Sequence, residues 1–147
     1  MPIICMGLKD IVVAASPEGV LVSDKKSSSY IKPFVENIHQ QIRFAEKSWG
    51  SFKVIDIDDE SLTIKVTLMP KQRMSYHSHK CRTETWNIVE GSGRTIVDGV
   101  EKMVKAGDVV ELPIGCKHTI IADTKLKIIE VQFGNYIDVE DKEMFKL

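Results

Sequence analysis

Short β-type segments separated by turn residues occupy most of the chain after Phe52, and they constrain the fold more than any other feature. Segment 61–68 alternates Leu, Ile and Val with Thr and Lys, which is typical of a strand with one buried face. Similar segments follow as far as Phe133, with Gly, Pro and Asp between them, and Asp98-Gly99 is a strong hairpin signal. Repeated short strands at this spacing predict a mainly β fold, an antiparallel sandwich or barrel.

The N-terminal part has a different pattern. Segments 10–15 and 20–23 are β-rich and flank the turn sequence SPEG, which predicts a hairpin. Apolar residues then recur at helical spacing from Ser27 to Glu46, so a helix is expected there, capped by Ser27 or Ser28. We therefore predict a hairpin and helix over residues 1–47 and a β domain over residues 48–147. A short helix is expected near the end, over residues 139–145.

Length and composition exclude several classes of protein. A chain of 147 residues suits one domain with a small appendage. A net charge of −1 does not indicate the basic surface that nucleic-acid-binding proteins carry, and no apolar run has the length of a membrane span. Three cysteines without a CxxC pair do not make a disulfide framework, and the first residues do not resemble a secretory signal. We therefore expect a cytoplasmic protein that binds neither nucleic acid nor membrane.

Two segments contain residues that suit a metal site. In SYHSHKCRTETW, His77 and His79 share one face of a strand, and Glu84 follows a short turn and is expected to return on the neighbouring strand. In GDVVELPIGCKH, two turns flank a strand and His118 opens the next one. Two hairpins packed face to face would bring these four residues together. Three imidazoles and a carboxylate suit one divalent ion, with Zn as first choice and Mn, Fe, Co or Ni as alternatives.

The same two segments carry a family resemblance. The run 70–91 resembles the first cupin motif and GDVVELPIGCKH the second, which implies a cupin fold, the double-stranded β-helix or jelly-roll barrel. WGSFKVID, PKQRMSYHSHKCRTETWNIVEGSG, LPIGCKHTI and IEVQFGNYI together resemble the C-terminal domain of type II phosphomannose isomerases. Those domains usually follow a mannose-1-phosphate guanylyltransferase domain. The N-terminal segment GLKDIVVAASPEGVLVSDK is similar to the last hairpin of that guanylyltransferase domain.

The resemblance implies an aldose–ketose isomerase that interconverts mannose 6-phosphate and fructose 6-phosphate. The nucleotide-binding loop of the guanylyltransferase is not in this sequence, so no guanylyltransferase activity is expected. Relatives often have a His-His-His run where this chain has His79-Lys80-Cys81. Two alternatives stay open. One is a non-catalytic cupin that binds a sugar or nucleotide sugar in polysaccharide metabolism, and the other is a different small metal-dependent cupin enzyme.

Candidate roles follow for the residues around the motifs. The predicted metal ligands are His77, His79, Glu84 and His118, and the candidate proton-transfer groups are Glu84 and Lys117. A phosphate needs cationic donors, and the candidate substrate-binding residues are Arg73, Ser75, Arg82 and Trp86. Trp86 either walls the site or packs in the core. The N-terminal hairpin and helix have apolar faces that must be buried away from water. We therefore predict that they pack on the cupin domain or on a second copy of the chain in a homodimer.

Overall fold

The structure is a computed structural model that describes residues 3–16, 19–36, 43–138 and 140–147. The chain divides into two compact units, residues 1–43 and 44–147. The helical elements are a 3-10 turn η1 (Ser27–Tyr30) and a helix α1 (Lys32–Glu36). The strands are β1 (Ile11–Ser16), β2 (Gly19–Asp24), β3 (Phe44–Lys47), β4 (Gly50–Ile57), β5 (Ser61–Leu68), β6 (His77–Ser78), β7 (Thr83–Glu90), β8 (Ser92–Val97), β9 (Val100–Lys105), β10 (Val109–Leu112), β11 (His118–Ala122), β12 (Leu126–Phe133) and β13 (Glu143–Met144).

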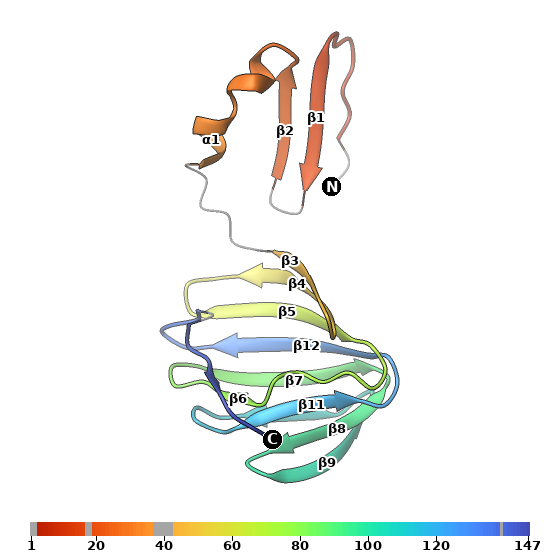
Figure 1. The fold of residues 1–147 in the computed structure, drawn as a ribbon, viewed down its shortest axis with the longest axis vertical. Coiled ribbons are helices and arrows are strands. Elements are labelled where there is room, and N and C mark those ends of the chain that lie inside the picture. Colours follow the sequence, from red (N-terminus) through yellow and green to blue (C-terminus); the bar gives the residue numbers. More distant parts are fainter. Residues whose placement is uncertain (1–2, 17–18, 37–42, 139) are drawn as a thin grey trace. The chain divides into compact units, whose positions relative to one another are not determined.

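Two antiparallel sheets form the second unit (Figure 1). The larger sheet has the strand order β10-β7-β12-β5-β4-β3, and the smaller has the order β13-β6-β11-β8-β9. Neighbours in each order are often far apart in sequence, as with β12, which pairs with both β5 and β7. The predicted mainly β, antiparallel architecture is therefore confirmed.

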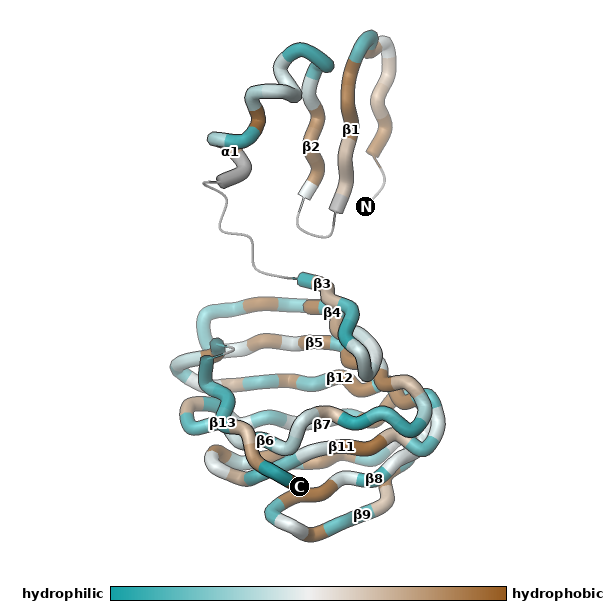
Figure 2. Tube along the Cα trace, in the orientation of Figure 1, coloured by the Kyte–Doolittle hydropathy of each residue, from teal (hydrophilic) through white to brown (hydrophobic). Residues whose placement is uncertain are grey.

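Alternation along the strands places the core between the two sheets. Brown and teal alternate along β5 and β12 in Figure 2, as expected for strands with one buried face. The buried apolar cluster draws on both sheets, including Leu68, Trp86 and Ile128 from the larger and Val104 and Ile120 from the smaller. Fully burying a side chain of this size contributes about 1.5–3 kcal/mol. One end of this interior is polar, and the site described below lies there.

The Asp98-Gly99 hairpin is confirmed. Both residues have positive φ, 48° and 80°, as a two-residue turn of this kind requires. The Asp98 carboxylate also accepts a hydrogen bond from the backbone N–H of Lys117 at 2.8 Å. The turn between β8 and β9 is thereby tied to the residue that precedes β11.

The predicted helix over residues 27–46 is wrong at its C-terminal end. Phe44–Lys47 is strand β3, which pairs with β4 across a tight turn, with Lys47 opposite Gly50. Pairing with the sheet outweighs the local helical pattern in this short segment. The described helical part ends with α1, and residues 37–42 lie outside the described residues. β3 thus belongs to the second compact unit.

The predicted helix over residues 139–145 is also wrong. Residues 143–144 form β13, which pairs with β6 so that Met144 lies opposite His77, and Val139 lies outside the described residues. The side chain of Asp141 accepts hydrogen bonds from the backbone N–H groups of Lys80 and Cys81 at 2.8 and 3.0 Å. These contacts hold the segment extended against the edge of the smaller sheet.

The first unit contains the predicted hairpin, with β1 and β2 in full antiparallel register; Pro17 and Glu18 of its turn lie outside the described residues. The predicted serine cap is wrong. No side-chain cap bond is made at the start of η1, and instead the Asp24 carboxylate accepts hydrogen bonds from the N–H groups of Lys26 and Ser27, each at 2.8 Å. Across both units, the described part of the chain contains no helix long and apolar enough to cross a membrane.

Candidate metal centre

Four titratable side chains converge in the second unit. His77 in β6 pairs in register with His118, the first residue of β11. His79 follows β6, and Glu84 is the second residue of β7 in the larger sheet. All four are buried, and one ligand atom from each lies within 4.8 Å of the others. Glu84 does return after the turn, but on the opposite sheet rather than on a neighbouring strand, so the site spans the interior between the sheets.

Backbone carbonyls orient all three imidazoles in the same way. Nδ1 of His77 lies 2.7 Å from the Ser75 carbonyl oxygen, and Nδ1 of His118 lies 3.1 Å from that of Cys116. Nδ1 of His79 makes the same contact with the carbonyl of Asp141. A carbonyl only accepts, so each Nδ1 carries a proton, and Nε2 is the nitrogen that can offer a lone pair to a metal. This pattern of Nδ1–H donation to a carbonyl is the usual support of a metal-binding histidine.

Arg82 is the nearest cation to this cluster and is itself buried. Its Nε donates to Glu84 Oε1 at 3.0 Å, and its Nη2 lies 3.2 Å from Nε2 of His79. A third donor, Nη1, reaches the carbonyl of Asp138 at 2.8 Å. The buried guanidinium of Arg82 therefore holds Glu84 and His79 in place.

The protonation states suit metal binding. Burial lowers the pKa of His77 to about 3, helped by the positive charge of Lys142, so His77 is neutral at pH 7. Burial opposes ionisation of Glu84, but the neighbouring His118 and His79 side chains outweigh it and hold the pKa of Glu84 below its usual value. The cluster thus presents the neutral imidazole of His77 and the ionised carboxylate of Glu84, the forms in which these groups bind a metal.

One ligand atom lacks a partner that a metal would provide. Nε2 of His118 is buried and has no hydrogen bond among the described residues, a state that proteins rarely leave uncompensated. Its distance to Glu84 Oε2 is 3.5 Å. Together with the N/O donor set, this atom fits the cluster to a divalent ion such as Zn, Mn, Fe, Co or Ni. His77, His79, Glu84 and His118 could hold such an ion, as the sequence predicts.

The other predicted site residues lie at varied distances from the cluster. Ser75 is half-buried and orients His77 through its backbone carbonyl. Trp86 is fully buried in the core, and its ring stands edge-on to His118 with centroids 5.4 Å apart. Arg73 is exposed and pairs with Ile121, while the Lys117 ammonium lies 4.3 Å from the centre of the Phe145 ring. The roles proposed for these residues stay predictions.

Three polar residues near the cluster were not expected from the motifs. Glu130 is buried in β12, where its carboxyl accepts hydrogen bonds from Trp86 Nε1 at 3.0 Å and Gln132 Nε2 at 2.5 Å. Burial, followed by the charge of Glu84, raises the pKa of Glu130 to about 8. The third is Lys142, whose positive charge acts on His77. Glu130 and Gln132 alternate with their neighbours in step with the buried apolar residues of β12, so they lie on its buried face. This alternation could have predicted their burial from the sequence. No comparable pattern in the sequence indicates a role for Lys142.

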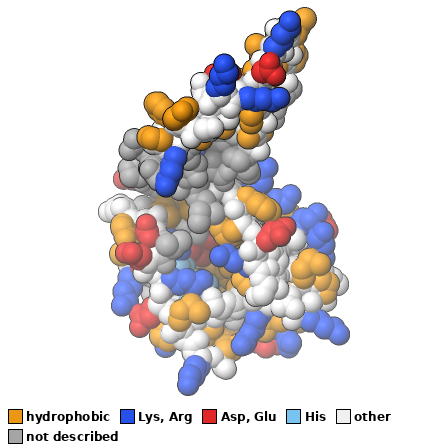
Figure 3. All heavy atoms as spheres, turned by 45° about the horizontal axis from the view of Figure 1, so that its top comes forward, with side chains coloured by type: hydrophobic (Ala, Val, Ile, Leu, Met, Phe, Trp, Pro, Cys, Tyr) orange, Lys and Arg blue, Asp and Glu red, His pale blue; other side chains and the backbone are white. Residues whose placement is uncertain are grey.

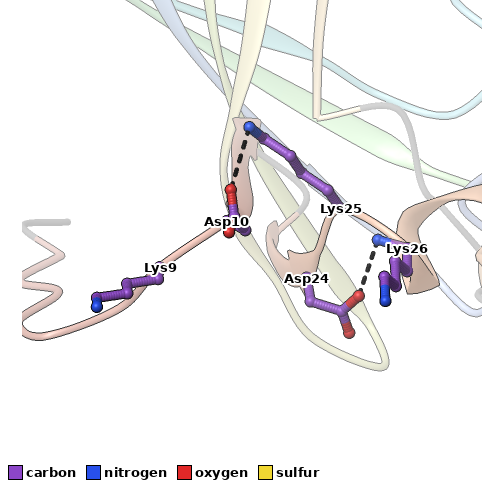
Figure 4. Close-up of a pocket in the computed structure, with 5 residues that line it drawn as sticks. All are labelled: Lys9, Asp10, Asp24, Lys25 and Lys26. Carbon is purple, nitrogen blue, oxygen red and sulfur yellow. Dashed lines mark hydrogen bonds and ion pairs between the residues drawn. The ribbon is translucent and has the colours of Figure 1, made fainter.

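A pocket in the first unit is lined by charged residues only (Figure 4). Its cations and carboxylates interact with one another. The Lys25 ammonium lies 3.6 Å from Asp10, and Asp24 accepts backbone hydrogen bonds. These interactions stabilise the turn after β2 and do not mark a binding site.

Comparison with known families identifies the chain. The family model described as the C-terminal part of mannose-6-phosphate isomerase matches residues 35–146. The chain belongs to this family. The resemblance seen in the sequence motifs is therefore confirmed, and the match includes all four residues of the metal cluster.

Curated relatives of this mannose-6-phosphate isomerase C-terminal chain are considerably longer. The mannose-1-phosphate guanylyltransferase of Escherichia coli is 29% identical over 95% of the chain, which matches 31% of that protein. A putative mannose-1-phosphate guanylyltransferase of Vibrio cholerae is 30% identical over 96% of the chain and 32% of its own length. The chain therefore spans about a third of the length of these relatives.

Solved structures support the cupin fold. An RmlC-like cupin from Shewanella frigidimarina superposes with a TM-score of 0.58 at 20% identity, covering 69% of this chain and 91% of that one. At this identity the likeness concerns the fold alone. The predicted cupin architecture is confirmed.

Proposed function

We propose that this chain is a metal-dependent isomerase that interconverts mannose 6-phosphate and fructose 6-phosphate. The observation that carries the proposal is the convergence of three carbonyl-oriented imidazoles and Glu84 in a chain of the mannose-6-phosphate isomerase C-terminal family. The buried cluster is the one place in the described residues where such a set of ligands occurs.

The residues divide the chemistry of such a reaction between them. A divalent ion held by His77, His79, Glu84 and His118 would polarise the sugar carbonyl and stabilise negative charge on its oxygen. The backbone carbonyls of Ser75, Cys116 and Asp141 fix the orientation of the three imidazole rings through their Nδ1 atoms. Arg82 fixes Glu84, and the buried ring of Trp86 packs edge-on against His118.

Isomerisation also requires a proton to move between C2 and C1 of the sugar. The base must reach the carbon-bound proton and be ionised at working pH. Glu84 is one candidate: its lowered pKa keeps it ionised among the four ligand residues, and the same lowered pKa makes it a weak base. Lys117 stays a candidate whose ammonium would first have to leave the ring of Phe145.

A coupled assay of mannose 6-phosphate isomerisation tests the proposal. The protein is stripped with EDTA and reloaded with Zn, Mn, Co, Fe or Ni in turn, and metal content is measured alongside turnover. We expect turnover with at least one metal, and we expect Glu84→Gln to lose both bound metal and turnover because it removes the anionic ligand. The matched control is Glu111→Gln, an exposed residue of β10.

Two outcomes would contradict the proposal. Absence of turnover with every metal, while sugar phosphate still binds, would favour the non-catalytic binding cupin. Retention of metal by Glu84→Gln would show that the ligand assignment is wrong.

A further inference from the structure

Basic side chains lie close to the histidines of the cluster. On the face drawn in Figure 3, a small area of histidine (pale blue) lies next to Lys or Arg side chains (blue). Within the cluster, Arg82 contacts two of the four ligand residues at once. Its Nε donates to Glu84 Oε1 at 3.0 Å, and its Nη2 lies 3.2 Å from Nε2 of His79. These two acceptor atoms are 3.1 Å apart, a spacing that suits the parallel Nε–H and Nη–H donors of a guanidinium.

The contact with Arg82 uses the one lone pair that the His79 ring has. Nδ1 of His79 donates to the Asp141 carbonyl, so the proton of the neutral ring is on Nδ1. A guanidinium has donors only, so the acceptor in the contact with Nη2 is Nε2 of His79. A lone pair that accepts this N–H cannot bind a metal at the same time. His79 therefore has either Arg82 or a divalent ion as its partner at Nε2.

Glu84 has no such conflict between Arg82 and a metal. A carboxylate has two oxygens, and the one that accepts from Arg82 is Oε1. The other oxygen, Oε2, lies 3.5 Å from Nε2 of His118. Glu84 can therefore offer Oε2 to an ion while Oε1 keeps its contact with Arg82, and the competition is specific to His79.

A second buried carboxylate can balance the charge of Arg82 when a divalent ion is bound. Nη1 of Arg82 donates to the Asp138 carbonyl at 2.8 Å and lies 3.7 Å from the carboxylate of Asp141. Glu84 and Asp141 are thus two buried anions beside one buried cation. A divalent ion would draw on the charge of Glu84, and Asp141 would remain as the partner of Arg82.

We propose that Arg82 and a divalent ion compete for Nε2 of His79, so that Arg82 is a positioning residue that sets how tightly the site binds metal. In the metal-stripped protein, the guanidinium satisfies both Glu84 Oε1 and His79 Nε2. In the loaded protein, Nη2 releases His79 while Nε stays on Glu84. The proposal rests on the metal-binding part of the proposed function and does not require the isomerase reaction.

Zinc titration of the EDTA-stripped protein, in competition with a chromophoric chelator, tests the proposal. We expect Arg82→Met to bind zinc about tenfold more tightly than the parent, because the lone pair of His79 is free and a nearby positive charge is gone. The stripped variant should also unfold at a lower temperature, because buried Glu84 loses its cation. The control is Arg94→Met, which removes a partly exposed arginine paired with Glu101 and should bind zinc as the parent does.

The sign of the change in zinc affinity separates competition from a merely structural role. If Arg82 only holds the ligands in place, Arg82→Met binds zinc more weakly than the parent, and that result or an unchanged affinity would overturn the proposal. Turnover by the parent with unchanged zinc affinity in Arg82→Met would leave the proposed function intact and refute the inference alone. Tighter zinc binding by Arg82→Met, with no turnover by the parent, would do the reverse.

NMR of the parent gives a second test that does not depend on how the variant folds. Before zinc is added, a scalar coupling across the N–H···N hydrogen bond should join Nη2 of Arg82 to Nε2 of His79. After one equivalent of zinc, this coupling should be lost and the Nε2 signal of His79 should shift as zinc binds. A coupling that persists in the zinc-loaded protein, or an imidazolium at His79 before zinc is added, would contradict the proposal.

Discussion

At the scale of single residues, the buried carboxyl of Glu130 makes the folding stability depend on pH. Burial and the charge of Glu84 raise its pKa to about 8, from an ordinary value of 4.5. Above pH 4.5 the unfolded chain releases this proton, but the folded chain keeps it. Folding stability from this group is therefore fully present below about pH 4.5 and is lost as pH rises toward 8. Each pKa unit corresponds to about 1.4 kcal/mol.

Replacing Glu130 by Gln should remove this pH dependence. The amide keeps the shape of a protonated carboxyl, can still accept from Trp86 Nε1, and has no charge to desolvate. We expect the metal-free variant to be more stable than the parent at pH 8 and similar at pH 5. Urea denaturation in EDTA at the two pH values measures this, with Glu111→Gln as the exposed control. Parallel pH profiles for variant and parent would contradict the assignment of a raised pKa.

At the scale of elements, residues 140–147 form a C-terminal strap that contributes both to the smaller sheet and to the support of His79. Asp141 binds two backbone N–H groups and supports His79, although it lies some sixty residues farther along the chain. β13 extends the smaller sheet by pairing with β6. The strap is therefore part of the sheet that holds His77, rather than a loose tail.

Asp141→Ala should loosen the strap and weaken metal binding together. The substitution leaves the N–H groups of Lys80 and Cys81 without their acceptor, which costs about 1–3 kcal/mol of unfolding free energy. Thermal unfolding and hydrogen exchange over residues 140–147 measure the effect, and metal titration follows the support of His79. Asp123→Ala, at an exposed position between β11 and β12, is the control. Unaltered protection of the strap in Asp141→Ala would show that β13 pairing alone holds it.

At the scale of the whole molecule, the first unit exposes apolar side chains. Val13 and Val22 lie opposite each other in the hairpin and are 44% and 50% exposed, and Phe34 of α1 is 74% exposed. A two-stranded hairpin is marginally stable by itself. We therefore propose that a second copy of the chain covers this face in a homodimer.

Light scattering tests the dimer. The parent is expected to have twice the mass of the chain, and Val13→Lys with Val22→Lys is expected to be monomeric, because two charges would be buried in the interface. Metal content should not change, since all four ligands belong to the second unit. Met103→Lys, at a residue 69% exposed in β9, is the control. A monomeric parent whose residues 1–43 are cut rapidly by protease would refute the proposal.

Local patterns in the sequence were sufficient to predict much of the fold. The period-two alternation predicts β5, the Asp98-Gly99 pair predicts the turn after β8, and the two motifs predict the four residues that converge at the candidate metal centre. Each of these features depends on neighbours within a few residues of one another. Helix prediction over 44–47 failed because strand pairing with β4, a tertiary interaction, decided the conformation there.

The sequence by itself determined the strands, the turn chemistry and the types of ligand atom in this protein. Only the tertiary structure decided that Glu84 faces the histidines from the opposite sheet and that Arg82 is buried among them. The reason is physical: a local pattern reports which face of a strand is buried, whereas the partner across the interior depends on how distant strands pair and how the sheets pack.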